Sequence, residues 1–367
     1  MSREPQRREV LAGIALGIAS EAIPSIARAA DEPSWTKLRT EPYRGKQDDI
    51  HFVSPDVGWY GNGKGRVYGT RDGGETWTLL WERPGTYVRA LGFVDENVGI
   101  LGNIGVDDFP DVTDTNPVYR TTDGGRTFNA VTAISEPVPK GICAIDVLRH
   151  SFINAGVLDT RVTLRAGGRV GGPAMLMTSH DLGVSWTSQD MSPLTGAILD
   201  IRFLDERTGF IAGASDPDVD RSNAVVLMTS DGGRSWRRVY QSARPFEITW
   251  KLSFPSPRVG YVTVQNYDDD VNVTRRVVAK TTDGGRTWHE LPVAIDHKLR
   301  EFGVGFLDER RGWIGGSTGG YETSDGGRSW RRVDMGLAVN KIRVVRQAGR
   351  TRVFAIGQDV RRLDLSV

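Results

Sequence analysis

Three short segments of the sequence carry closely spaced aspartates. Such aspartates can present hard oxygen ligands to Ca²⁺. The sequence therefore predicts a possible calcium site, whose candidate ligands are Asp107, Asp108, Asp111, Asp216, Asp218 and Asp220, with Asp268-Asp269-Asp270 as the third acidic segment. The segment Asp216–Asp220 lacks the glycine and the distal glutamate of an EF-hand loop. Solvated loops kept apart by their like charges are the favoured interpretation, and a site for a basic ligand is a further alternative.

A second set of residues is suited to an anionic or sugar ligand. These candidate ligand-binding residues are Arg89, Arg165, Arg169, Arg244, Lys251 and Arg300. Two of them lie in the Gly-rich stretch 165–172. Because no helix is predicted after that stretch, a nucleotide-phosphate loop is not indicated. Taken individually, each of these cations is better explained as an ordinary surface charge.

The remaining candidates concern catalysis. Glu247 or Glu301 could act as a general acid near His297. Glycoside hydrolysis needs two carboxyl groups about 5–10 Å apart across the scissile bond, and sequence spacing does not establish such a pair. The only cysteine, Cys143, is expected to be a small buried hydrophobe. We therefore favour a non-catalytic protein, with a glycoside hydrolase as the alternative.

An eight-residue repeat shows which elements position these residues. Its pattern is Ser/Thr-x-Asp-x-Gly-x-Ser/Thr-aromatic, called an Asp-box, and its six copies are residues 70–77, 121–128, 179–186, 229–236, 281–288 and 323–330. A recurrence every 40–60 residues is typical of repeat folds. We expect the Asp to accept hydrogen bonds from turn amides and the aromatic residue to wedge between units. These residues are predicted to serve folding, not catalysis.

A second phrase lies upstream of five copies: a Phe, then a Gly six residues later. The pairs are Phe52/Gly58, Phe93/Gly99, Phe203/Gly209, Phe254/Gly260 and Phe306/Gly312. Two apolar runs around such a polar turn predict a hairpin. A third run leads into the eight-residue repeat and a fourth leaves it. Each unit is thus predicted to be a four-stranded antiparallel blade of a β-propeller.

The two ends of the chain complete the count of blades. Three strands are predicted after the sixth repeat, at 341–345, 352–356 and 360–363, while residues 34–38 resemble an isolated fourth strand. If the N-terminal strand joins the last blade, no sheet edge stays open. We predict an all-β, seven-bladed propeller in one domain over residues 34–365. Its third blade, about 141–192, diverges and lacks the Phe/Gly phrase.

The repeats also locate the variable loops. From the hairpin Phe to the repeat Asp there are 20 residues in the first unit and 19 in the sixth, but 30, 28 and 29 in the second, fourth and fifth. The extra residues fall between the second and third strands, on the face opposite the repeats. Inserted loops on a rigid scaffold are frequent binding sites. We expect the ligand on this loop-rich face.

Composition and the N-terminus suggest a location. The net charge of +1 does not favour nucleic-acid binding. Arg7-Arg8, an apolar run at 10–19 and Ala27-Arg28-Ala29 are similar to a twin-arginine export signal over residues 1–29. The apolar run is short for a membrane span. We expect a periplasmic or extracellular protein, a monomer without a transmembrane segment in its mature chain.

These phrases resemble two groups of Asp-box propellers. Over residues 34–365 the chain resembles the photosystem II assembly and stability factors, which are exported seven-bladed scaffolds. That resemblance implies a protein partner and an Arg-rich patch, for which Arg165 and Arg169 are the nearest candidates. The sialidases are a more distant likeness that implies a glycan substrate. Pro42-Tyr43-Arg44-Gly45 departs from their Phe/Tyr-Arg-Ile/Leu-Pro motif at its last two positions, and sialidases have six blades.

Overall fold

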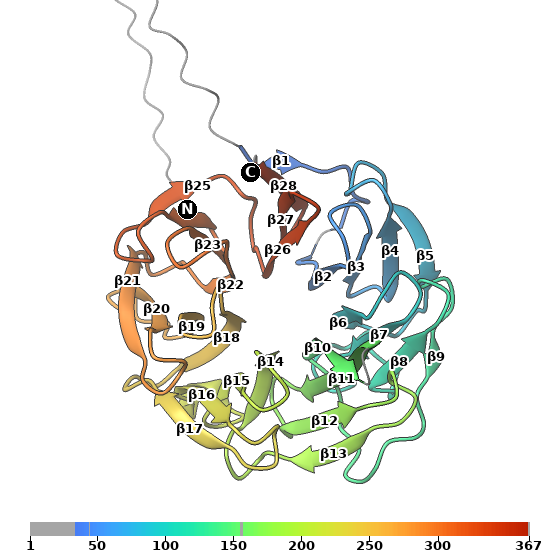
Figure 1. Ribbon diagram of the computed structural model, residues 1–367. Coiled ribbons are helices and arrows are strands. Elements are labelled where there is room, and N and C mark those ends of the chain that lie inside the picture. Colours follow the sequence, from blue (N-terminus) through green and yellow to red (C-terminus); the bar gives the residue numbers. More distant parts are fainter. Residues whose placement is uncertain (1–33, 44, 155–156, 366–367) are drawn as a thin grey trace, which may run out of the picture. The chain divides into compact units, whose positions relative to one another are not determined.

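The computed structural model consists of seven four-stranded antiparallel sheets arranged in a ring (Figure 1). It describes residues 34–43, 45–154 and 157–365. The all-β, seven-bladed prediction is therefore confirmed. The predicted export signal at 1–29 lies outside the described residues. Within the described part of the chain, no helix has the length and apolarity to cross a bilayer.

Each sheet runs from an innermost first strand to an outermost fourth strand. The first three blades contain β2 (Asp49–Phe52), β3 (Gly58–Asn62), β4 (Arg66–Thr70), β5 (Thr78–Glu82); β6 (Val88–Phe93), β7 (Gly99–Asn103), β8 (Val118–Thr121), β9 (Asn129–Ala130); and β10 (Ala144–Asn154), β11 (Val157–Gly168), β12 (Met175–Ser179), β13 (Thr187–Asp190). The next three contain β14 (Ala197–Phe203), β15 (Gly209–Ala214), β16 (Ala224–Thr229), β17 (Arg237–Gln241); β18 (Glu247–Ser253), β19 (Gly260–Asn266), β20 (Arg275–Thr281), β21 (His289–Ile295); and β22 (Glu301–Phe306), β23 (Gly312–Gly316), β24 (Gly319–Thr323), β25 (Arg331–Val333). A 3₁₀ turn, η1 (Val219–Arg221), precedes β16.

The seventh blade joins the two ends of the chain. It contains β26 (Lys341–Gln347), β27 (Arg350–Ile356), β28 (Val360–Leu365) and, outermost, β1 (Thr36–Lys37). Thr36 pairs with Arg362 and Lys37 with Arg361, and β1 and β28 lie side by side in Figure 1. The N-terminal strand therefore completes the last blade, as its resemblance to the other fourth strands predicts.

The Phe/Gly phrase has a simple steric cause. Phe52 lies directly across the strand pair from Gly58, and a Cβ on that glycine would come within 2.4 Å of the Phe52 ring. The ring therefore lies flat over the glycine and stacks on Phe354 of the seventh blade, with 3.7 Å between ring centroids. Trp59 and Tyr261 stack in the same way on Phe93 and Phe306 of their next blades. The phrase thus builds the contact between blades.

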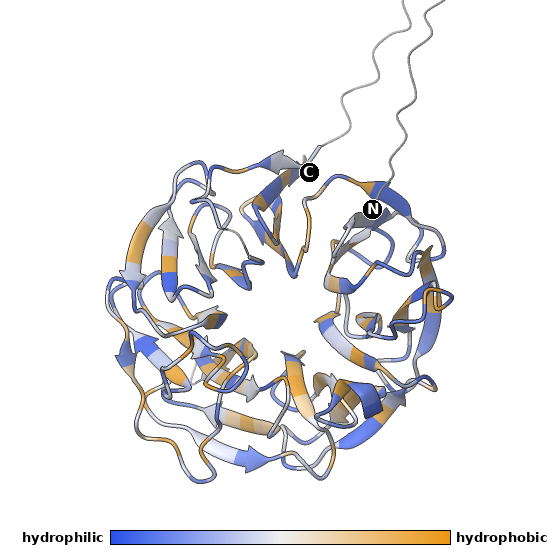
Figure 2. Ribbon diagram, turned by 180° about the vertical axis from the view of Figure 1, so that it is seen from behind, coloured by the Kyte–Doolittle hydropathy of each residue, from blue (hydrophilic) through white to orange (hydrophobic). Residues whose placement is uncertain are grey.

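The eight-residue repeats form superimposable turns between third and fourth strands. In the first, Asp72 accepts hydrogen bonds from the amide and the hydroxyl of Thr76, while Thr70 Oγ1 accepts from the Gly74 amide. The Asp–amide bond recurs at Asp123, Asp181, Asp231, Asp283 and Asp325. The Asp residues are therefore occupied in holding turns, as expected. Apolar segments recur in every blade around the ring (Figure 2).

Antiparallel blades give the ring two distinct faces. We call the side with the eight-residue repeats and the turns between first and second strands the repeat face. The other side, with the loops between second and third strands and the connections between blades, is the loop face. The third blade differs from the others, because β10 and β11 are 11 and 12 residues long, whereas the other first and second strands have four to seven. The first part of the Gly-rich stretch 165–172, residues 165–168, is the end of β11.

Candidate functional site

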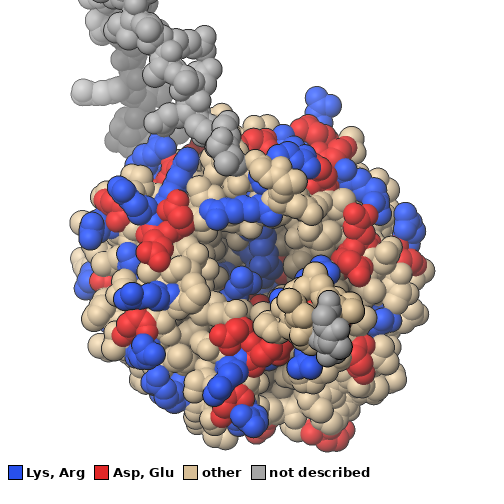
Figure 3. Space-filling model, viewed as in Figure 1, with Lys and Arg blue, Asp and Glu red and all other residues tan. Residues whose placement is uncertain are grey.

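Charged side chains gather around the axis of the ring, where the first strands meet. Asp49 Oδ2 lies 3.1 Å from Lys341 Nζ, and Lys251 Nζ donates to the Leu199 carbonyl at 2.7 Å and lies 3.8 Å from Asp200 Oδ1. These side chains come from four blades and are almost fully buried. Figure 3 shows Lys and Arg side chains inside the central hollow. The axis is therefore lined by buried charges that join the first blade to the seventh and the fourth blade to the fifth.

The loop-face end of the axis opens into a cavity of about 980 Å³. Aromatic side chains provide much of its wall: Tyr43, Tyr87, Phe109 and Trp250. Tyr87 and Phe109 stack with 4.7 Å between ring centroids, and Phe109 is 42 % exposed. Cations and carboxylates complete the lining, namely Lys46, Lys64, Arg89, Asp48, Asp108 and Asp111. Large, mostly apolar cavities with a few placed polar groups are the usual form of a binding site.

Asp48 organises the floor of this cavity. Its carboxylate accepts hydrogen bonds from Arg89 Nη1 at 2.7 Å and from the Tyr87 hydroxyl at 2.5 Å, and lies 3.2 Å from Lys46 Nζ. Burial alone would raise the pKa of Asp48, but the Lys46 and Arg89 charges hold that pKa below its usual range. Asp48 is therefore a fixed anion that orients two cations.

Trp250 of the fifth blade and Asn340, which precedes the first strand of the seventh blade, brace the same floor. The Trp250 indole donates to Asn340 Oδ1 at 2.8 Å, and the Asn340 amide donates to the Asp48 carbonyl at 2.7 Å. The Lys46 ammonium lies 5.2 Å from the Trp250 ring centroid, and the Arg89 guanidinium 5.0 Å from it. These contacts hold the cations in place before any ligand arrives, which reduces the entropic cost of binding.

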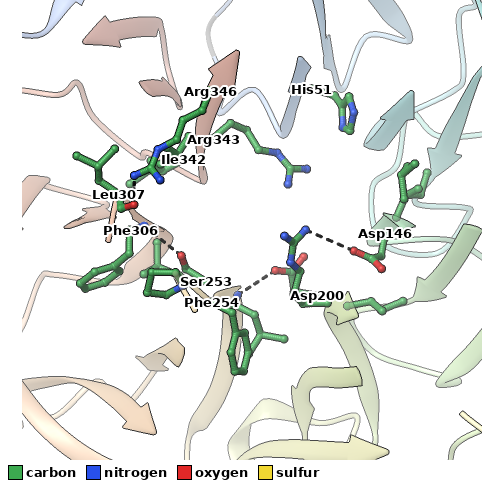
Figure 4. A pocket seen from close by; sticks show the side chains of 18 residues that line it. His51, Asp146, Asp200, Ser253, Phe254, Phe306, Leu307, Ile342, Arg343 and Arg346 are labelled. Carbon is green, nitrogen blue, oxygen red and sulfur yellow. Dashed lines mark hydrogen bonds and ion pairs between the residues drawn. The ribbon is translucent and has the colours of Figure 1, made fainter. Parts of the chain in front are cut away.

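The repeat-face end of the axis forms a second, smaller pocket of about 320 Å³ (Figure 4). Arg343 and Arg346 lie on one side of this pocket, and Asp146 and Asp200 on the other. Burial, followed by the Arg343 charge, lowers the pKa of His51 to about 3, so this histidine is neutral at physiological pH. The opposed charges and smaller volume distinguish this mouth from the aromatic cavity.

Of the six predicted ligand-binding cations, only Arg89 lines the loop-face cavity. Arg169 lies at its edge, where its guanidinium donates to Asp108 Oδ2 at 2.7 Å and to the Val106 carbonyl at 2.8 Å. Arg165 lies elsewhere: its guanidinium stacks 3.4 Å from the Phe203 ring centroid, between the third and fourth blades. The structure therefore does not bring Arg165 and Arg169 into one patch.

The other three cations are occupied outside the cavity. Arg244 pairs with Glu247 and Glu290 at 2.6 and 2.9 Å, and the Arg300 guanidinium lies 5.2 Å from the Tyr267 ring centroid. Lys251 belongs to the axial network, where burial lowers its pKa to about 7. Ligand binding by these residues stays a prediction, and their positions do not support one common site.

The predicted catalytic carboxylates lie within the wall of the ring. Glu247 Oε1 accepts from Arg244 and from the Asn266 amide, and Glu301 is fully buried with no hydrogen-bond partner on either carboxyl oxygen. Neither lines the loop-face cavity. The His297 carbonyl accepts from Arg276 and Arg300. These placements give no support to glycoside hydrolysis by this trio.

Glu301 leads to a testable prediction about stability. Burial raises the pKa of Glu301 well above its usual 4.5, the Arg276 charge opposes that rise, and Glu247 adds to it. The native state then holds a proton that the unfolded chain releases above about pH 4.5. This contribution to stability is complete below pH 4.5 and is lost as pH rises through the native pKa. Glu301→Gln should therefore reduce the loss of stability between pH 5 and pH 8.

The measurement is urea unfolding of both proteins across that pH range. Glu136→Gln, at an exposed position, serves as the matched control and should leave the pH dependence as in the unmodified protein. If the free energy of unfolding changes with pH in the same way for the unmodified protein and for Glu301→Gln, then Glu301 is ionised in the folded state.

Basic side chains engage two of the three acidic insertions. Arg221 pairs with Asp216 and Asp218 at 3.1 and 2.8 Å, and Arg169 with Asp108. Asp107 lies 3.6 Å from Lys140, Asp111 lines the cavity, and Asp220 is exposed. Among the described residues, no group of three or more His, Cys, Asp or Glu is arranged to hold a metal. This arrangement does not fit the six to eight oxygen ligands of Ca²⁺, and calcium binding stays an untested prediction.

Sequence reasoning missed Asp48 and Trp250, although a signal for the site was present. The residue four positions before each hairpin Phe lies at the loop-face end of a first strand. In the five blades with the phrase, these residues are Asp48, Arg89, Leu199, Trp250 and Phe302. A charged or aromatic residue at four of these five positions could have indicated the floor of the cavity.

The fold and the cavity together define a seven-bladed propeller with a ligand-sized opening at one end of its axis. No protein-family model matches the chain, and no curated protein matches it. Among solved structures, it is similar to YCF48 bound to D1 peptide, with a TM-score of 0.61, 14% identity, and coverage of 92% of this chain and 99% of that one. For YCF48 from Cyanidioschyzon merolae the TM-score is 0.59 and the identity 17%, with coverage of 91% of this chain and 98% of that one. For the WD40 repeats of RRP9 the TM-score is 0.60 and the identity 10%, with coverage of 91% of this chain and 98% of that one. Such identities establish the fold alone.

Proposed function

We propose that this protein is a non-catalytic binding scaffold that holds a segment of a partner protein in the loop-face cavity. The observation that carries the proposal is the aromatic wall of Tyr43, Tyr87 and Phe109 above a floor of fixed charges. Aromatic side chains give large contact area at low entropic cost, and fixed charges give orientation. One structural neighbour, YCF48, was solved with a D1 peptide bound, which supports a peptide as the class of ligand.

In its finer form, the proposal includes an exported, monomeric protein acting in assembly, as the resemblance to photosystem II assembly factors implies. The twin-arginine-like segment at 1–29 supports export to the periplasm or the cell exterior. A glycan is the alternative ligand. None of the placements above favours a hydrolase, so hydrolysis is not proposed.

Site-specific crosslinking tests the proposal. The photoreactive residue benzoylphenylalanine would replace Phe109, which lines the cavity and is exposed. On irradiation in the native cell, we expect one predominant crosslinked protein, with mass spectrometry locating the link in one short segment. The matched control places the same residue at Leu79, which is 44% exposed on the outermost strand of the first blade.

A second arm separates the alternatives. Lys64→Ala removes an exposed cation of the cavity and should weaken binding of the captured segment, made as a peptide, by about threefold to tenfold. Equal crosslinking from positions 109 and 79 would contradict a cavity-bound partner. Cleavage of a glycan panel by the purified protein, without any captured segment, would favour the hydrolase.

A further inference from the structure

The long hairpin of the third blade is unlike any other turn on the repeat face. β12 pairs with β11 only from Leu164 to Gly168, so the outer part of the hairpin extends past the third strand of its own sheet. Three large apolar side chains of this extension are mostly exposed: Ile153 at 77%, Leu158 at 71% and Val157 at 68%. Clustered exposed apolar residues on a soluble fold usually mark a contact with something else.

The register of the hairpin places these side chains on both of its faces. Ile153 pairs with Leu158, so both side chains lie on one face, and Phe152 pairs with Asp159 on the other face. Val157 lies on the same face as Phe152. It is two residues from Asp159 on one strand, and side chains two residues apart on a strand point to the same face. A flat protein surface would cover only one of these faces. An apolar medium that surrounds the end of the hairpin would cover both.

Behind this apolar end lies a collar of polar and basic residues. Ser151 and Thr160 pair with each other through their hydroxyl groups at 3.0 Å. His150 and Arg161 form the next cross-strand pair, and the Arg161 guanidinium lies 5.6 Å from the Phe152 ring centroid. Arg149 follows, and donates to the Val94 carbonyl at 2.6 Å. Asp159 is the acidic residue of this segment.

We propose that this hairpin inserts into the surface of a lipid bilayer and attaches the repeat face to a membrane. Two to three strand residues span about 7–10 Å, which matches the depth to which interfacial segments enter the boundary of the acyl chains. Arg149 and Arg161 then lie at headgroup level, where each cation near an anionic surface contributes about 1 kcal/mol. The loop-face cavity, at the other end of the axis, stays open to a partner.

A labelled hairpin tests the proposal in the full-length protein. Cys143 is buried, so Ser151→Cys provides an accessible thiol for an environment-sensitive fluorophore. Vesicles of phosphatidylglycerol and phosphatidylcholine should shift its emission to the blue, and brominated lipids should quench it. The same label at Ser192→Cys, in a connection of the loop face, should show neither effect. The N-terminal apolar run is present in every variant, so it does not account for a difference between label positions.

The matched variants measure the apolar contribution. Ile153→Ser with Leu158→Ser should lower the vesicle partition coefficient by at least about tenfold, whereas Val271→Ser with Ile295→Ser, which removes two exposed apolar residues of the loop face, should leave it within twofold. Pure phosphatidylcholine should bind more weakly than the mixture. An unshifted Ser151 label on every vesicle, or equal partitioning of the hairpin variant and the unmodified protein, overturns the proposal. Hairpin-dependent dimers in sedimentation without vesicle binding would also overturn it and identify a second copy as the occupant.

Discussion

Asp49→Ala should destabilise the protein by about 3–5 kcal/mol, because it leaves a buried lysine without its counter-charge. Asp49 Oδ2 lies 3.1 Å from Lys341 Nζ and accepts the Leu91 amide at 2.9 Å, and both charged side chains are almost fully buried. Burial alone would raise the pKa of Asp49, but the Lys341 and Arg343 charges hold that pKa below its usual range. The carboxylate therefore joins the first, second and seventh blades, and its loss affects all three contacts.

The measurement is urea unfolding at pH 7, read as the change in the free energy of unfolding. Asp218→Ala, which breaks an ion pair with the exposed Arg221, is the matched control and should cost less than about 1 kcal/mol. Asp49→Ala combined with Lys341→Met should recover part of the loss, because both buried charges are then removed. A single variant Asp49→Ala within 1 kcal/mol of the unmodified protein would show that the axial charges are solvated.

Gly58→Ala is the second substitution with a large expected effect. The new methyl group would lie 2.4 Å from the Phe52 ring, which is itself held between Gly58 and the stacked Phe354 ring. The ring cannot yield without losing the contact between the first and seventh blades. We expect a loss of about 2–3 kcal/mol in the free energy of unfolding, at the upper end of overpacking effects.

A double-mutant cycle identifies the cause of that loss. Phe52→Leu should make room for the added methyl group, so the double variant should be clearly less destabilised than the sum of the single variants. Thr78→Ala, at an exposed position of β5, should be nearly neutral. Strict additivity of Gly58→Ala and Phe52→Leu would mean that the glycine is needed for its backbone and not for the ring.

Much of the fold could be predicted because the same sequence patterns recur in successive blades. The Phe/Gly phrase recurs in five blades, and each copy reflects the same ring-over-glycine contact. The closing strand could be predicted as well, since residues 34–38 resemble the fourth strands that follow the repeats. The third blade lacks the Phe/Gly phrase, so the lengths of its strands could not be predicted by comparison with the other blades. The glycines of the stretch 165–172 give no strand signal, and pairing with β10 and β12 makes residues 165–168 strand.

The candidate site was harder to predict, because its members are distant in sequence and ordinary in type. Asp48, Arg89 and Trp250 meet only when three first strands converge on one axis. Charge alone gave a misleading selection, since a guanidinium such as that of Arg165 can be buried on an aromatic ring as readily as it can face a ligand. Burial, which separates these two situations, depends on the neighbouring blade and not on the residue's own segment.

The pairing of β1 with β28 also determines when this protein can finish folding. Thr36 is among the first described residues to leave the ribosome, and its pairing partner Arg362 is among the last. The two strands cannot pair until Arg362 has been synthesised. At synthesis rates of about 5–20 residues per second, that interval is on the order of tens of seconds. Until it ends, β1 has no partner strand, and its unpaired backbone groups are of the kind that other chains can join. A translocation pathway that threads unfolded chains would postpone closure to the far side of the membrane, whereas one that carries folded cargo requires closure before departure. The pairing of one two-residue strand therefore sets the earliest moment at which the ring can close.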